Sequence, residues 1–141
     1  MKIWRHTLLM TILITPLTST ATETRITVGF TPGNSATLNV LNVANSVHSS
    51  LDVAAYGFTS RQVAEALLAA QHRGVKVRVL ADAKDNDGKY SAVTWLQRQG
   101  VPVRLNGKYA IQHNKFMVAD SVTTQTSSIT PTPEGGIPNI L

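Results

Sequence analysis

The feature that most constrains the fold of this chain is a strand–helix–strand pattern between residues 51 and 80. Residues 51–58 form a mostly apolar run of the kind found in buried strands, and residues 75–80 form a second strand-like run. Between the two runs, Thr59-Ser60-Arg61-Gln62 matches a capping box, which predicts a helix that Gly74 ends. The apolar positions on one face of this helix are Val63, Ala66, Leu67 and Ala70.

Segments of the same two kinds surround this unit. Because repeated β-α units produce parallel strands, the sequence predicts one α/β domain with a largely parallel sheet covered by helices. Pro102 cannot donate to a β-ladder, which favours either an edge position for its strand or a place at the beginning of that strand. The other expected elements are a strand at 26–30, a helix capped by Asn34 or Ser35, a polar loop at 82–88, a helix at about 89–99, a strand at 101–105, a turn at 106–107, a strand carrying His113 and Lys115, and a partner strand at 122–126 beyond a turn at 120–121.

Residues 1–21 are expected to be an export signal. Lys2 and Arg5 form a positive start, residues 8–14 form a short apolar core, and small residues at 19–21 offer a cleavage site. The alternative is an uncleaved membrane anchor, but the apolar run is shorter than the roughly 20 residues that span a bilayer. The chain has no cysteine, which suits an oxidising compartment. The expected location is periplasmic or secreted, with no stable membrane span after cleavage.

Size and charge limit the classes of function. The 141 residues are enough for one domain with a real core, and the 43% hydrophobic and 15% charged content is that of a globular protein. The formal charge is +5, and it falls to +3 without Lys2 and Arg5 because Lys and Arg then number 11 against 8 acidic residues. A mild positive charge favours polyanionic partners such as nucleic acid or anionic lipid.

The strongest functional signal is the stretch from Gln112 to Asp120. Side chains alternate along a strand, so His113 and Lys115 should point to one side. Phe116 and Val118 should then point into the core. An imidazole beside a fixed cation suits a phosphate, although a bare pair of this kind can also be two exposed strand residues.

With these residues placed, the chain resembles the phospholipase D superfamily. His113, Lys115 and Asp120 fit its HxKxxxxD signature, and the chain is similar to the small secreted bacterial endonuclease branch from about Arg25 to Thr126. The elements that carry this resemblance are Val28-Gly29-Phe30-Thr31-Pro32, Ala55-Tyr56-Gly57-Phe58-Thr59, Arg73-Gly74-Val75-Lys76-Val77 and Ile111-Gln112-His113-Asn114-Lys115. The implied fold is a mixed, largely parallel sheet flanked by helices.

The resemblance implies cleavage of phosphodiesters without a metal or other cofactor. A histidine attacks phosphorus to form a phosphohistidine, a second histidine protonates the leaving oxygen, and the lysine neutralises charge on the phosphate. Asp82, Asp85 and Asp87 could suggest a metal site, but their loop lacks the glycine and glutamate of a calcium loop and is interpreted as solvated.

Two histidines are needed, and the chain has a single HxK motif. His48 and His72 lie on expected helices and are interpreted as surface residues. Members of this branch form a twofold dimer that joins two motifs, so the resemblance implies a homodimer with the active site at its interface.

Other candidates have two interpretations each. Asp120 belongs to the catalytic motif, but its spacing from Lys115 favours a role in bracing a turn or a neighbouring cation. Tyr56, Phe58 and Trp95 are interpreted as core residues in preference to a platform for stacking bases.

After Thr126 the chain departs from the family pattern, which expects a glycine-serine-aromatic-asparagine run. Residues 127–141 contain three prolines and two glycines, which predicts an irregular tail after an incomplete domain at 22–126. Ser128 is the candidate for the phosphate-binding serine, and no asparagine follows it two residues later. A missing strand and helix would impair activity.

Three functions therefore remain at this stage. The first is metal-independent phosphodiester hydrolysis on DNA or RNA, the second is hydrolysis of phospholipid headgroups, and the third is an inactive remnant that binds polyanions.

Overall fold

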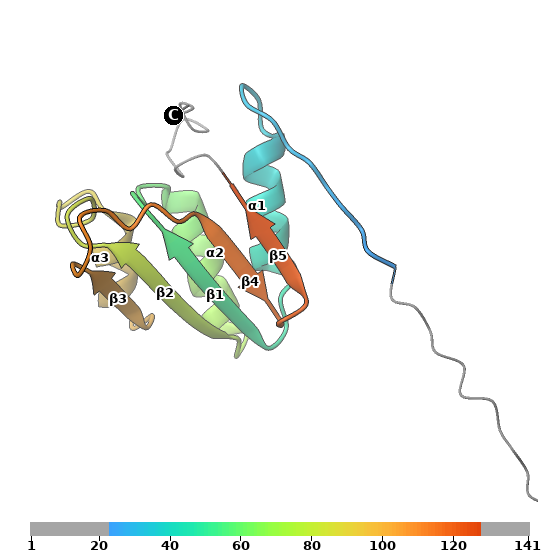
Figure 1. Cartoon of the computed structure of the whole chain (residues 1–141). Helices are drawn as coiled ribbons and strands as arrows, with labels where there is room; N and C mark the ends of the chain where they lie inside the picture. Colours follow the sequence, from blue (N-terminus) through green and yellow to red (C-terminus); the bar gives the residue numbers. More distant parts are fainter. Residues whose placement is uncertain (1–22, 128–141) are drawn as a thin grey trace, which may run out of the picture.

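A five-stranded mixed sheet in the order β3-β2-β1-β4-β5 organises the chain, for which a computed structural model describes residues 23–127. Strands β3, β2 and β1 run parallel, whereas β4 is antiparallel to β1 and to β5. The elements are α1 (Ser35–Ser46), β1 (Ser50–Ala55), α2 (Arg61–His72), β2 (Lys76–Asp82), α3 (Ala92–Arg98), β3 (Val103–Asn106), β4 (Phe116–Ala119) and β5 (Thr123–Thr126). The predicted α/β class is confirmed (Figure 1).

The central unit β1-α2-β2 has the boundaries that its local signals predict, within a few residues. Ser60 and not Thr59 caps α2, because the Ser60 Oγ accepts a hydrogen bond from the Val63 N–H at 3.4 Å. The helix ends at His72, and Gly74 follows the C-cap Arg73 with a φ of +93°, which few other residues adopt at low cost. The helix expected at 89–99 is shorter, and Ser91 caps it through a bond from the Val93 N–H.

The helices lie together on one face of the sheet, as Figure 1 shows, and the core forms between these two layers. Successive side chains of a strand point to opposite faces of the sheet, so every second strand residue points into this core. The core-facing strand residues are Leu51, Val53, Ala55, Val77, Val79, Ala81, Met117 and Ala119.

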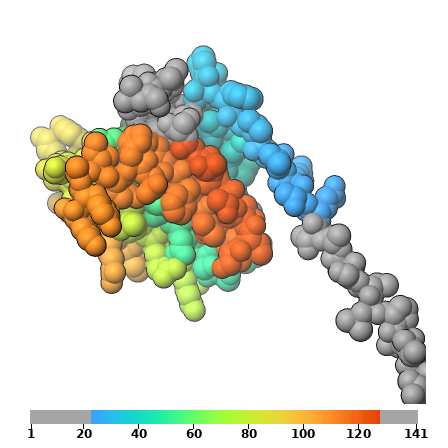
Figure 2. Space-filling model, viewed as in Figure 1, coloured from blue at the N-terminus to red at the C-terminus, as the bar shows by residue number. Residues whose placement is uncertain are grey.

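The opposite face carries a polar pair among apolar side chains. Arg78 binds Asp52 through two hydrogen bonds of 2.6 Å from its Nε and one terminal nitrogen. Leu80 and Phe116 lie on the same face and are partly exposed. Figure 2 views this face and shows the segment between β3 and β4 spread across part of it.

Two expectations about strands are wrong. Residues 26–30 form no strand, and Ile26, Val28 and Phe30 are exposed. The strand expected to carry His113 and Lys115 begins only at Phe116. Within β4, Met117 and Ala119 face the core, whereas Phe116 is 38% exposed and Val118 is partly buried, so the predicted inward face was the opposite one.

The remaining strand predictions are confirmed. The strand that follows Pro102 is β3, at one edge of the sheet. β5 pairs with β4 in register across the turn at Asp120 and Ser121. Both turn residues have positive φ, 53° and 61°, as a tight hairpin turn of the primed kind requires.

Truncation of the core side chain of Leu67 should destabilise the protein. Leu67 is fully buried on α2, so Leu67→Ala removes apolar contacts and leaves a cavity. The free energy of unfolding should fall by about 2–5 kcal/mol, measured by urea denaturation. Leu38→Ala in α1 is the matched control, since Leu38 is 52% exposed and its loss should be much smaller. Equal losses would contradict the placement of the core.

Candidate active site

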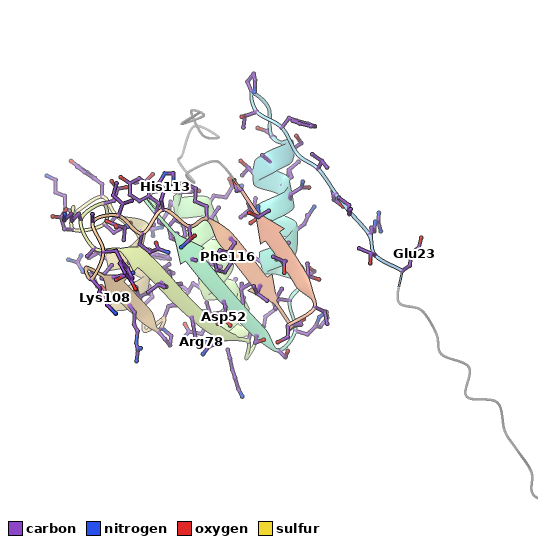
Figure 3. The ribbon with its side chains drawn as sticks, viewed as in Figure 1. Glu23, Asp52, Arg78, Lys108, His113 and Phe116 are labelled. Atoms are coloured by element: carbon purple, nitrogen blue, oxygen red, sulfur yellow. The ribbon has the colours of Figure 1, made fainter. Side chains whose placement is uncertain are left out.

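His113 and Lys115 meet just before β4, at the carboxyl end of β1. They belong to the connection from β3 to β4, which crosses the ends of β2 and β1 because these two strands separate β3 from β4 in the sheet (Figure 3). The Lys115 Nζ lies 2.9 Å from the His113 Nε2. The sequence predicted that the two groups converge, but an irregular segment brings them together, not a strand.

Lys115 is an amine in a largely buried environment. The side chain is only 8% exposed, and burial lowers the pKa of its ammonium, while the nearby Asp85 carboxylate opposes this change. An ammonium group has no lone pair, so in the charged state Lys115 must donate to the Nε2 of a neutral His113. The proton of that imidazole then lies on Nδ1.

Tyr56 forms an aromatic wall of the site. Its ring centroid is 4.7 Å from that of His113, with the planes tilted by 58°, and the Lys115 Nζ lies 5.3 Å from the Tyr56 ring. A hydrogen bond to Asp85 raises the pKa of the Tyr56 hydroxyl and fixes the far end of the ring. The prediction that Tyr56 is a core residue is therefore wrong, whereas Phe58 is buried as expected and Trp95 packs partly buried against the core.

Asp82 holds the reactive segment in place. Its Oδ2 accepts a hydrogen bond of 2.8 Å from the Gln112 N–H, and its Oδ1 accepts from the N–H groups of Lys84 and Asp85. These bonds, led by the one from Gln112, lower the pKa of the Asp82 carboxyl. The interpretation of this residue as part of a solvated loop is wrong, because Asp82 is buried and fixes the residue that precedes His113.

Asn86 completes a buried network behind Tyr56. Its Nδ2 donates to the Tyr56 and Asp82 carbonyl oxygens, and its Oδ1 accepts from the Phe58 N–H and the Ser91 Oγ. Sequence reasoning missed Asn86. Its position after the carboxyl end of β2, the end where open α/β sheets bind ligands, was the available signal.

Asp120 lies at the other end of β4. Its carboxylate accepts hydrogen bonds from the backbone N–H groups of His48, Ser49 and Ser50 and from the Ser49 Oγ, at 2.7–3.0 Å. Antiparallel pairing of β4 with β1 places His113 and Lys115 beyond Ala54, whereas Asp120 lies beside Ser50. Within one chain Asp120 therefore does not join the pair as a catalytic group, and its contacts are those of a brace.

The other candidates contribute nothing to the pair. His48 and His72 are exposed, as expected for surface residues. Ser128 and the tail beyond it lie outside the described residues, as does the segment at 1–21. Within residues 23–127, no cluster of three or more histidine or acidic side chains could hold a metal ion, and no helix is long and apolar enough to cross a membrane.

The fold and this site define a known class of protein. The family model described as "Cardiolipin synthase, PLD-like domain" matches residues 40–135, more than half of the chain. The chain therefore belongs to the phospholipase D-like family, as the HxKxxxxD resemblance predicted. This family contains hydrolases, as the names of the relatives show.

Individual relatives support the same assignment. The phospholipase D of Rickettsia conorii is 32% identical over 110 residues, which cover 78% of this chain and 55% of that protein. The mitochondrial cardiolipin hydrolase of Drosophila melanogaster is 38% identical over 71 residues, which cover 50% of this chain and 28% of that protein. The chain thus spans about half the length of the first of these relatives.

Solved structures share the fold. Nuc from Salmonella typhimurium, described as a phospholipase D family member, superposes with a TM-score of 0.72 at 34% identity, covering 75% of this chain and 71% of that one. NucT from Helicobacter pylori has a TM-score of 0.62 at 22% identity, covering 71% and 69%, and supports the fold alone.

The Asp120 brace makes stability depend on pH. The bonds that Asp120 accepts hold its pKa well below the ordinary value of 3.8, so their contribution is complete above that value and is lost as the pH falls through the lower folded pKa. Asp120→Asn should lower the melting temperature at pH 7, and the difference from wild type should shrink below about pH 4. Thermal unfolding followed by circular dichroism measures both effects.

Asp87→Asn is the matched control, because Asp87 is an exposed carboxylate in another loop. This variant should melt close to wild type at every pH. A melting temperature of Asp120→Asn equal to wild type at pH 7 would contradict the role of Asp120 as a brace.

Proposed function

We propose that this protein hydrolyses phosphodiesters through a phosphohistidine, with nucleic acid as the substrate. The observation that carries the proposal is the 2.9 Å contact between the Lys115 Nζ and the His113 Nε2, made by a lysine that is only 8% exposed. A lysine in such a position presents a positive charge where solvent screens it least. A phosphate oxygen can take the place of Nε2 as the partner of the ammonium.

The chemistry follows from these two groups. Once Lys115 binds a non-bridging phosphate oxygen, the Nε2 lone pair of His113 is free to attack phosphorus, and the bond from phosphorus to the leaving oxygen breaks. A second histidine gives its proton to that oxygen. Water then attacks the phosphohistidine and gives a proton to the second histidine, which became neutral in the first step; the P–N bond breaks, and both imidazoles return to their starting states. Lys115 stabilises the charge on the phosphate in both steps.

Tyr56 and Asp82 act as positioning residues in this proposal. Tyr56 restricts the rotation of the imidazole through ring contact, and Asp82 fixes the backbone at Gln112. Groups held before the substrate arrives do not have to be ordered during the reaction, which lowers the barrier.

Hydrolysis of phospholipid headgroups is the second candidate. It is favoured by the names of the relatives, phospholipase D and cardiolipin hydrolase, and by the exposed side chains of Tyr109 and Ile111 on the segment that leads to His113. Nucleic acid remains the first candidate because the chain is basic and because its exposed aromatic rings Tyr90 and Tyr109 each lie beneath a lysine. Export to the periplasm or medium remains a prediction from residues 1–21.

Replacement of the nucleophile should abolish turnover in the presence of excess EDTA. Wild type should cleave single-stranded DNA in the chelator, and His113→Asn should be about a thousandfold slower or worse, because asparagine cannot form the phosphohistidine. Gel electrophoresis of a labelled oligonucleotide measures the rate. His72→Asn, a change at an exposed histidine on α2, should retain full activity. Cleavage that stops in EDTA and returns with a divalent ion would sink the metal-independent mechanism.

The second histidine is proposed to come from another copy of the chain. Wild type mixed with an equal amount of His113→Asn, after subunit exchange, should retain about half of its original activity, because random pairing leaves half of the wild-type chains in intact dimers. Activity that stays equal to that of the wild type alone would show that each chain works by itself. A mixture in which wild type replaces the variant is the control.

A further inference from the structure

A concave surface apart from the catalytic pair lies close to the loop from β1 to α2. It is a pocket of about 260 Å³ between the start of α2, the loop before α3, and α3 itself. We refer to it as the cation–aromatic pocket, and the lining residues that matter here are Arg61, Lys89, Tyr90, Ser91, Trp95 and Arg98.

The charge of this pocket favours an anionic ligand. Arg61, Lys89 and Arg98 are exposed, and none of the lining residues is acidic. Glu65 binds the Arg61 Nε at 3.0 Å and offsets part of that charge. Lys89 and Arg98 form no ion pair within residues 23–127, so their charges face whatever enters.

Aromatic rings alternate with these cations. The guanidinium carbon of Arg61 lies 3.9 Å from the centroid of the Trp95 ring, and the Lys89 Nζ lies 5.0 Å from that of Tyr90. Tyr90 is 81% exposed, which leaves its ring open to a flat ligand. Single-stranded nucleic acid binds to surfaces of this composition, because phosphates pair with the cations and bases stack on the rings.

The pocket is connected to the catalytic pair by the buried network behind Tyr56. Ser91, which lines the pocket, donates to Asn86, and Asn86 donates to the Tyr56 carbonyl oxygen. The ring of Tyr56 contacts His113. The loop that follows β1 is therefore linked to the pocket through Asn86 and to the pair through the Tyr56 ring.

We propose that the cation–aromatic pocket binds a second nucleotide of a single-stranded nucleic acid whose reacting phosphodiester lies at His113 and Lys115. The inference rests on the proposed phosphodiesterase function and adds to it a second binding site and the single-stranded form of the substrate. A phospholipid offers phosphate to the cations but has no flat base for the exposed ring of Tyr90, and this difference favours nucleic acid.

The salt dependence of binding tests the pocket. Affinity of the full chain for a fluorescein-labelled single-stranded DNA is measured by anisotropy across a series of NaCl concentrations. Lys89→Ala and Arg98→Ala should each lower the slope of log affinity against log salt by about 0.7, because each removes one phosphate contact. Tyr90→Ala should weaken binding about tenfold through the loss of base stacking. Circular dichroism verifies that the variants are folded.

Lys76→Ala is the matched control, since Lys76 is an exposed lysine at the opposite end of β2. It should leave the slope unchanged. Slopes of Lys89→Ala and Arg98→Ala equal to that of Lys76→Ala would overturn the inference. The inference would also be overturned if Lys89→Ala and Arg98→Ala lost binding to vesicles of anionic phospholipid while their binding to DNA stayed unchanged.

Turnover of a small diester separates this inference from the proposed function. Bis(4-nitrophenyl) phosphate occupies only the catalytic pair, so Lys89→Ala and Arg98→Ala should cleave it at the wild-type rate. If the wild type cleaves neither this diester nor the oligonucleotide, the proposed phosphodiesterase function is refuted. The salt slopes would still decide whether the pocket binds nucleic acid.

Discussion

The hydrogen bond from the Gln112 N–H to the buried Asp82 carboxylate is the constraint on which the site depends. The reactive residues lie on a segment with no regular secondary structure, so no helix or ladder fixes their backbone. Asp82 ends β2, a strand that β1 and β3 hold from both sides, and its carboxylate transfers that rigidity to the segment above. A buried charge is costly unless it is satisfied by hydrogen bonds, and here three backbone donors meet that need. The same bonds that stabilise Asp82 therefore order the residues around His113.

The two halves of the HxKxxxxD pattern serve opposite ends of one strand. The residues between Lys115 and Asp120 are the four residues of β4, so the spacing of the motif is the length of that strand. At one end the chain presents His113 and Lys115, and at the other the Asp120 carboxylate binds the backbone that leads into β1. The aspartate thus fixes the position of β4 along β1, and with it the position of His113 and Lys115 at the carboxyl end of β1.

Local signals in the sequence predicted the core of the fold and the meeting of His113 and Lys115, but not the residues that hold this pair in place. The capping box at residues 59–62, the helical face with Leu67 and the glycine after α2 lie close together in the sequence, so the unit β1-α2-β2 was predictable to within a residue at the cap. Residues 26–30 have strand-like composition, but a strand exists only with a partner, and the sequence cannot name one. Phe116 and Val118 were predicted to form the inward face of β4, but Met117 and Ala119 face the core, so the prediction was wrong by one residue. Asn86 and Tyr56 could not be assigned because their roles arise from contacts across the fold.

The pairing of β1 has a consequence for the order in which the protein is made. One neighbour of β1 in the sheet is β2, which follows it in the chain after the single helix α2. The other neighbour, β4, is separated from β1 by some sixty residues. Closing this longer loop costs more conformational entropy. A ribosome releases β1, α2 and β2 before the residues of β4 have been joined to the chain. The nascent protein can therefore hold a sheet, a helical layer and the Asp82 anchor while it still lacks its catalytic chemistry. The His113–Lys115 pair takes its place beside β1 only when β4 pairs with that strand, and a nascent chain that ends before His113 presents the scaffold without the pair.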